Sequence, residues 1–351
     1  MMFRIPRVLL LFVALATFAA ACGDDDETST GQGGEDLPTV VVTTNILGDV
    51  VTELTGGAVN VVTIMPVGAD PHDFQASAQQ VDQMTSAGVL IVNGASFEEG
   101  LLDVIENAET DGVAVYEAIS PVSTIDFAEG GHDHDHDHEG EEAHEDEDHD
   151  HDHEGEEGHD DHDHDDHEGH DHSGTDPHFF TDPARMALAV DGIAAFLIAN
   201  VEGIDADAVT AAAEAYHEEL EALDAEVMTL IEAIPADGRV LITNHEVFGY
   251  FADRYGFEVA GAVIPSGSTV DGSSAGELAE LAEVIEDEGV TAIFSDVSAS
   301  DQLAQTLADE VGDIAVVELF TESLGASDSG GATYVEMIRT NAERISEALA
   351  S

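Results

Sequence analysis

The sequence predicts an α/β protein of two lobes, each with a mostly parallel sheet flanked by helices, joined by one long rigid helix. Three observations lead to this fold class. Short runs of β-branched and aliphatic residues alternate with helical patterns in both halves of the chain. One uninterrupted helical pattern separates the halves. Finally, 351 residues with 43% hydrophobic content are enough to build two cores.

The first half contains four short apolar runs that we expect to be strands, at residues 39–43, 59–65, 89–92 and 113–116. Helical spacing is found at residues 46–54, 75–87, 97–108 and 182–201. Nearly continuous apolar strands that alternate with helices are typical of a parallel sheet covered on both faces. We therefore expect an N-terminal α/β lobe at residues 37–204.

The second half repeats this alternation and predicts a C-terminal α/β lobe at residues 236–351. Its expected strands are residues 239–243, 257–263, 291–295 and 314–319. Its expected helices are residues 246–255, 274–287, 301–311 and 333–349. In open α/β sheets a ligand lies beyond the carboxyl ends of the strands, so we expect a ligand in the cleft between the lobes.

Residues 207–234 form a helical pattern with no glycine or proline before Pro235. A helix of this length spans about 40 Å, which is more than one small lobe needs. We interpret residues 205–235 as a rigid linker helix between the lobes. The alternative is an ordinary surface helix of one lobe.

The N-terminus has the pattern of an export signal. Arg4 and Arg7 precede an apolar run that is too short for a comfortable membrane span, and small residues follow it. We expect a signal peptide at residues 1–21, lipidation of Cys22 and a flexible lipid-anchored tether at residues 22–36. The alternative is simple secretion, which would leave the thiol of Cys22 free.

The charge of the chain excludes one class of partner. The formal net charge is −70, and all seven basic residues are arginines. Nucleic acid is excluded as a partner, because phosphate binding requires basic side chains.

A histidine- and acid-rich stretch at residues 132–172 holds fourteen of the eighteen histidines. Almost nothing in it is apolar, so a disordered, solvated loop at residues 130–174 is expected. Alternating imidazoles and carboxylates favour a metal-collecting role over a solubilising acidic spacer, because a spacer needs no histidine.

Four other side chains follow an expected strand or precede an expected helix: His72, His178, His245 and Glu322. Two come from each half of the chain. Three neutral imidazoles and one carboxylate make a tetrahedral ligand set suited to zinc. His72 and His178 both stand in the sequence Asp-Pro-His, so Asp70 and Asp176 could orient them. The alternative is that Asp before Pro only marks a turn. The remaining histidine, His217, is expected to be a solvated residue of the linker helix.

The residues around these four side chains resemble the metal-binding lipoproteins that supply zinc and manganese ABC transporters. The resemblance extends over residues 37–351, and its motifs are GADPHDF at 68–74, TDPHFFTDP at 175–183, TNHEVFGYF at 243–251, LFTESL at 319–324 and GATYVEM at 331–337. It implies an extracytoplasmic protein, anchored to the outer face of the membrane, that passes its metal to a membrane permease and has no catalytic residues. A monomer is expected.

The resemblance also assigns roles to single residues. It implies that His72, His178 and His245 bind the metal, and a histidine at the third position favours zinc over manganese. Glu322 stands where the family usually has aspartate, so either Glu322 or water is the fourth ligand. Asp296 matches a position that is often acidic and is expected to support the ligands or to replace one.

Three alternatives to zinc transport remain open from the sequence. The first is a manganese-binding protein of the same class. The second is a zinc-dependent hydrolase, although no HExxH motif accompanies the histidines. The third is a surface protein for cell adhesion or metal buffering.

Overall fold

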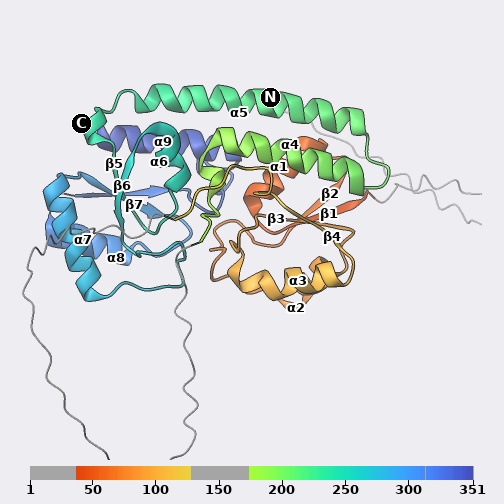
Figure 1. Cartoon of the computed structure of the whole chain (residues 1–351), viewed down its shortest axis with the longest axis horizontal. Helices are drawn as coiled ribbons and strands as arrows, with labels where there is room; N and C mark the ends of the chain where they lie inside the picture. The colour runs from red at the N-terminus through yellow and green to blue at the C-terminus, as the bar shows by residue number, and fades with distance from the viewer. Residues whose placement is uncertain (1–36, 128–173, 313, 351) are drawn as a thin grey trace, which may run out of the picture. The chain divides into compact units, whose positions relative to one another are not determined.

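A computed structural model describes residues 37–127, 174–312 and 314–350. The expected signal peptide, the tether with Cys22 and nearly all of the histidine- and acid-rich loop lie outside the described residues. Within the described residues the two-lobed α/β fold class is confirmed (Figure 1).

The N-terminal lobe contains a parallel four-stranded sheet in the order β2-β1-β3-β4. Its strands are β1 (Thr39–Val42), β2 (Asn60–Thr63), β3 (Val89–Val92) and β4 (Ala114–Glu117). Its helices are α1 (Asn45–Thr55), α2 (Ala78–Thr85) and α3 (Leu102–Thr110). Helix α1 begins where the Thr44 side chain accepts a hydrogen bond from the Leu47 amide, and it ends at Gly56, whose φ of 54° is left-handed.

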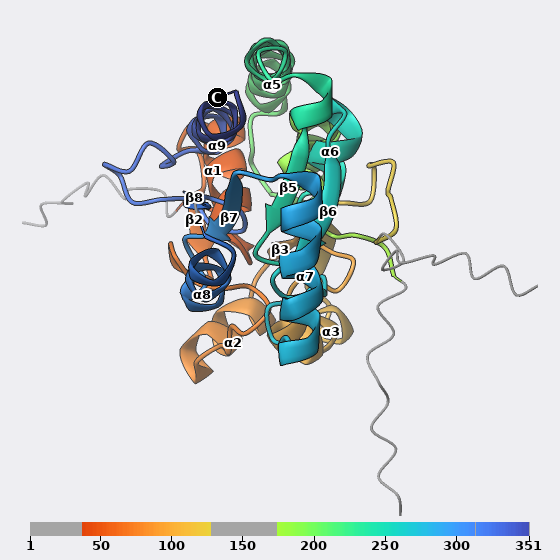
Figure 2. The same ribbon diagram turned by 90° about the vertical axis from the view of Figure 1, so that its left-hand side faces the viewer.

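The C-terminal lobe repeats this topology in the order β6-β5-β7-β8. Its strands are β5 (Val240–Thr243), β6 (Glu258–Ala262), β7 (Ala292–Asp296) and β8 (Ala315–Leu319). Its helices are α6 (Gly249–Tyr255), α7 (Ala275–Glu288), α8 (Gln302–Val311) and α9 (Tyr334–Leu349). Helices cover both faces of each sheet, with α2, α3, α7 and α8 on the faces away from the linker helix (Figures 1 and 2).

Helix α5 (Ala206–Ile231) links the lobes, as predicted. It lies across the outside of both lobes, over α4 (Pro183–Asn200) and α1 at one end and over α9 at the other (Figure 1). Helix α4 is long and apolar enough to cross a membrane by composition alone, but its buried face belongs to the main core of the protein.

One hydrophobic cluster extends through both lobes. It includes Val50 of α1, Ile193 of α4, Leu220 of α5, Phe294 of β7 and Ile338 of α9. Two smaller clusters lie on the outer sheet faces of the separate lobes. Because the lobes share the larger core, moving them apart would expose apolar surface at a cost of about 25 cal/mol per Å².

Three expected helices begin later than predicted. Helix α2 begins at Ala78 rather than at Gln75, because the Ser77 side chain caps its start. Helix α6 begins at Gly249 rather than at Glu246; the preceding segment is a turn in which the Val247 amide donates to the His245 carbonyl and the Glu246 amide to the Ser266 carbonyl. The helix expected at residues 97–108 is divided into a short 3-10 turn, Glu99–Leu101, and α3. It is preceded by a turn in which Ala95 and Ser96 have φ of 50° and 61°.

Candidate metal centre

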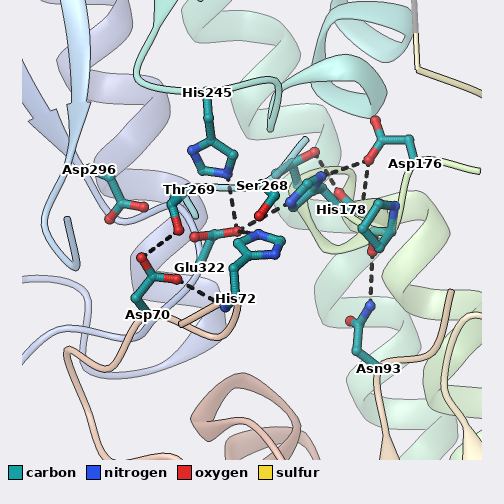
Figure 3. Close-up of polar contacts among 12 residues, drawn as sticks. Asp70, His72, Asn93, Asp176, His178, His245, Ser268, Thr269, Asp296 and Glu322 are labelled. Carbon is teal, nitrogen blue, oxygen red and sulfur yellow. Dashed lines mark hydrogen bonds and ion pairs between the residues drawn. The ribbon is translucent and has the colours of Figure 1, made fainter. Parts of the chain in front are cut away.

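The four side chains singled out from the sequence lie together between the two lobes (Figure 3). His72 lies in the loop after β2, His178 precedes a 3-10 turn, His245 follows β5 and Glu322 follows β8. Each offers one ligand atom, and these four atoms lie within 4.8 Å of one another. All four residues are at least 97% buried.

Three imidazole nitrogens surround one carboxylate oxygen. The Oε1 atom of Glu322 lies 2.7 Å from Nε2 of His72, 3.2 Å from Nε2 of His178 and 3.1 Å from Nε2 of His245. Around a tetrahedral zinc ion with bonds of about 2.0–2.1 Å, ligand atoms lie about 3.3–3.4 Å apart. The donors therefore need only small shifts to surround an ion of that size.

The two Asp-Pro-His sequences form the same local turn. Asp70 Oδ1 accepts the amide of His72 at 2.9 Å, and Asp176 Oδ1 accepts the amide of His178 at 2.8 Å. An aspartate that binds the backbone two residues later makes an Asx-turn, and the intervening proline fixes φ. The repeated motif thus presents each imidazole from a rigid loop.

The two aspartates differ in what else they bind. Asp176 also contacts Nδ1 of His178 at 2.8 Å, so the expectation that it orients this ring is confirmed. Asp70 does not contact the ring of His72; its second oxygen accepts the hydroxyl of Thr269 from the C-terminal lobe at 2.6 Å. Asp70 therefore orients His72 through its backbone amide and not through its ring.

Glu99 occupies the place expected for Asp70. Its Oε1 lies 2.9 Å from Nδ1 of His72. No sequence pattern predicts this contact, because it depends on the turn before the 3-10 segment. The adjacent Glu98 points inward instead and accepts hydrogen bonds from the Thr43 hydroxyl and the Asn93 amide, both at 2.6 Å.

The charges in the site offset one another. Burial lowers the pKa of His72, but the carboxylates of Glu322 and Glu99 outweigh this and raise it to about 10. The pKa of His178 is likewise raised, because Asp176 and Glu322 outweigh its burial. Burial raises the pKa of Glu322, but the neighbouring imidazoles hold it well below its usual range. Without a metal, the extra protons of His72 and His178 therefore balance the Glu322 carboxylate.

Asp296 lies near this cluster but outside the set of converging ligand atoms (Figure 3). Its Oδ1 accepts the amide and the hydroxyl of Ser298, at 2.7 and 2.8 Å. Burial, reinforced by the negative charge of Glu322, raises the pKa of Asp296 to about 6. Its influence on the site is therefore electrostatic in this geometry.

His217 lies on α5, away from the other three histidines outside the rich stretch. Its Nδ1 lies 3.2 Å from Asp191 Oδ2 of α4, and its side chain is 31% exposed. His217 is therefore partly exposed and paired with an acid rather than fully solvated.

A cavity of about 770 Å³ opens beside His72. Its lining includes Glu99, Glu117, Phe127 and Ser268, together with His72 itself. Of the four converging residues, His72 is the one that lines this cavity. The cavity thus lies against the candidate centre on the side of His72.

Known proteins share this fold and sequence pattern. The profile of the family described as zinc-uptake complex component A, periplasmic (ZnuA) matches residues 40–348. The manganese-binding lipoprotein MntA of Halalkalibacterium halodurans is 26% identical over 333 residues, which cover 95% of each chain. The zinc-binding protein TroA of Treponema pallidum is 27% identical over 354 residues, covering 99% of this chain and 98% of TroA.

The solved structure of TroA is also similar. It has a TM-score of 0.72 at 26% sequence identity, and the match covers 90% of this chain and 100% of that one. The relatives are binding proteins rather than enzymes, so the hydrolase alternative is set aside. The chain therefore belongs to the zinc-uptake component A family, the extracytoplasmic metal-binding components of ABC uptake systems.

Proposed function

We propose that this protein captures zinc outside the cytoplasm and passes it to the membrane permease of an ABC transporter. The observation that supports this most is the convergence of His72, His178, His245 and Glu322 in one buried site. Their imidazoles and carboxylate are ligand types that zinc accepts in a tetrahedral arrangement. Zinc is the transported cargo here rather than a resident cofactor.

The donor set favours zinc over manganese. Imidazole suits zinc, whereas manganese prefers carboxylate, carbonyl and water oxygens. One carboxylate belongs to the converging set, and the nearby Asp296 uses one oxygen to bind Ser298. Since one relative is named for manganese and another for zinc, the metal must be decided by this chain's own ligands.

We assign the fourth ligand to Glu322 rather than to water. Its Oε1 already lies within 3.2 Å of all three Nε2 atoms. Its Oε2 is buried and has no hydrogen-bond partner among the described residues. A metal ion would compensate for the cost of keeping that oxygen away from water.

Small local changes at the site are a better account of metal exchange than wide separation of the lobes. Asn45 of α1 donates to the Ser323 hydroxyl at 3.0 Å and accepts the Leu324 amide at 2.7 Å. Tyr334 of α9 donates its hydroxyl to the Phe180 carbonyl at 2.8 Å. These bonds connect the lobes.

The membrane-facing parts of the proposal rest on the sequence. Lipidation of Cys22 would hold the protein at the outer face of the membrane, close to its permease, and the protein would act as a monomer. The histidine- and acid-rich stretch would collect zinc near the site. Deleting residues 130–173 should leave one high-affinity zinc site, because the four proposed ligands lie elsewhere.

Competition calorimetry between zinc and manganese tests the proposal. The wild-type protein should bind zinc more tightly, and His72→Ala and Glu322→Ala should weaken zinc binding. His217→Ala is the matched control, because this histidine lies outside the site and should leave affinity unchanged. Tighter binding of manganese would refute the choice of metal, and unchanged zinc affinity in both site variants would refute the ligand set.

A further inference from the structure

The imidazoles of the site differ in what holds their second nitrogen. Nδ1 of His178 contacts Asp176, whose side chain is 3% exposed. Nδ1 of His72 contacts Glu99, whose side chain is 38% exposed. Nδ1 of His245 is buried and has no hydrogen-bond partner among the described residues. His72 is thus the ligand candidate whose supporting carboxylate reaches the outside.

We propose that Glu99 is a positioning residue that holds His72 ready for zinc and sets how fast zinc passes through the cavity beside it. The proposal rests on the zinc-binding function proposed above and adds a residue that the sequence motifs do not mark. Glu99 would act through His72 rather than bind the metal itself.

His72 donates the hydrogen bond that joins it to Glu99. An ionised carboxylate can only accept, so the proton of this contact lies on Nδ1 of His72. When zinc displaces the proton that Nε2 shares with Glu322, the Nε2 lone pair faces the other three donors. An anionic partner on the far nitrogen fixes the ring and increases its strength as a ligand.

The imidazole ring of His72 has little room to turn. The His72 ring meets the edge of Phe97, with ring centroids 5.3 Å apart and an interplanar angle of 74°. The rings of His178 and His245 lie 5.8 and 5.7 Å from it. Glu99 therefore determines the orientation of a ring that its neighbours already confine.

A strained turn before Glu99 determines where its side chain lies. Ala95 and Ser96 both have positive φ, a conformation that costs non-glycine residues on the order of 1 kcal/mol each. Glu98 stabilises this turn from inside through the Thr43 hydroxyl and the Asn93 amide. A side chain at Gly100 would collide with the Phe74 carbonyl, so this glycine allows the segment to approach the His72 loop closely.

Glu99 and His72 lie together at the cavity beside the site. Glu99 and His72 both line the 770 Å³ cavity, whereas His178, His245 and Glu322 do not. A cation that comes through this cavity meets the Glu99–His72 pair before the other three ligands. The negative charge of Glu99 would attract the ion, and the hydrogen bond from His72 to Glu99 would hold the first ligand in place.

The test compares Glu99→Gln and Glu99→Ala with Glu117→Gln in the full chain. Glu117 lines the same cavity, carries the same charge and has no hydrogen bond to His72 among the described contacts, so it controls for charge. Zinc affinity would be measured with a competing chromophoric chelator. Zinc association and dissociation rates would be measured by stopped flow, and the apo-protein melting temperature would check the fold.

Loss of such a supporting carboxylate typically weakens metal binding by about 10–100-fold, and we expect this range for Glu99→Ala. Glu99→Gln should be intermediate, because its amide oxygen can still accept from Nδ1. Glu117→Gln should stay within about twofold of wild type, in line with a surface charge that touches no ligand. Equal affinities and rates for the Glu99 and Glu117 variants would overturn the proposal.

Cobalt spectroscopy separates positioning from a loss of the site. In each Glu99 variant the cobalt d–d spectrum should keep the wild-type shape at saturation, because the four ligands are unchanged. A changed spectrum would mean that Glu99 is itself a ligand and would contradict the positioning role. Failure of the wild type to bind zinc would instead refute the proposed function, which makes the two failures distinguishable.

Discussion

Glu322 Oε1 lies 2.7 Å from His72 Nε2, although 250 residues separate the two along the chain and they come from different lobes. Two further imidazoles meet the same oxygen. In this arrangement the extra protons of His72 and His178 take the place of a cation. A metal ion must therefore displace protons when it binds.

The first prediction is that zinc binding releases protons. The pKa of His72 is raised from 6.5 to about 10, so this ring carries an extra proton at pH 7 in the metal-free protein. We expect about one to two protons released per zinc, because ligand imidazoles must be neutral. Affinity should accordingly rise with pH from 6 toward 10. Calorimetry in buffers of different ionisation enthalpy measures this, and a binding heat independent of buffer would contradict it.

The second prediction concerns the carboxylate at the centre of the site. Glu322→Gln should weaken zinc binding by at least about tenfold, because it removes a charged ligand from a buried site. It should also lower the pKa values of His72 and His178, which Glu322 helps to raise. Chelator competition and histidine NMR titration measure the two effects. Glu318→Gln, an exposed position on β8, is the control, and equal affinity in both variants would argue for water as the fourth ligand.

The third prediction concerns the connection between the lobes. Asp70 of the His72 loop accepts a 2.6 Å hydrogen bond from Thr269 of the C-terminal lobe. Thr269→Val keeps the side-chain shape but removes the donor, and such a loss costs about 0.5–1.5 kcal/mol. Since Asp70 also holds the His72 amide, we expect faster zinc release in stopped-flow experiments. Thr306→Val on the exposed face of α8 is the control, and equal release rates would show that this bond does not restrain the loop.

The fourth prediction concerns stability rather than binding. Burial raises the pKa of Asp49 from 3.8 to about 6, and the acids Glu53 and Glu336 add to this. The folded state therefore binds a proton that the unfolded state has lost between about pH 4 and 6. Stability of the metal-free protein should fall across this range as pH rises, and the cost should persist at neutral pH.

Asp49→Asn should remove that cost and still accept the Tyr334 amide, which Asp49 binds at 2.8 Å. We expect the variant to be more stable at pH 7 by roughly 1–2 kcal/mol, with no advantage below pH 4. Urea unfolding at several pH values measures the difference. Asp82→Asn on the exposed face of α2 should have no such effect, and an equal gain from both would refute the assignment to burial.

Much of the fold followed from local patterns. The β-branched runs predicted, to within a few residues, all eight strands in the part of the chain that the structure describes, because strands in covered parallel sheets are rich in apolar residues. The absence of glycine and proline predicted α5. The four converging side chains could be chosen because each stands next to the end of a strand or the start of a helix, where parallel sheets gather their loops.

What the sequence did not predict depends on contacts between distant segments. Glu246 favours a helix by composition, yet its amide donates a hydrogen bond to the Ser266 carbonyl, and α6 begins only at Gly249. Asp70 and Asp176 share one motif, but only Asp176 contacts the imidazole of the histidine that follows it. The second oxygen of Asp70 accepts a hydrogen bond from Thr269 instead. Glu99 was missed because a turn with positive φ at two non-glycine residues determines its direction.

The most direct test is the position of zinc in crystals of the zinc-loaded protein, located by anomalous scattering at the zinc absorption edge. The account predicts one strong peak between the lobes, about 2.0–2.2 Å from Nε2 of His72, His178 and His245 and from a carboxylate oxygen of Glu322. A peak elsewhere, with the three imidazoles still hydrogen-bonded to Glu322 as in the metal-free arrangement, would contradict it.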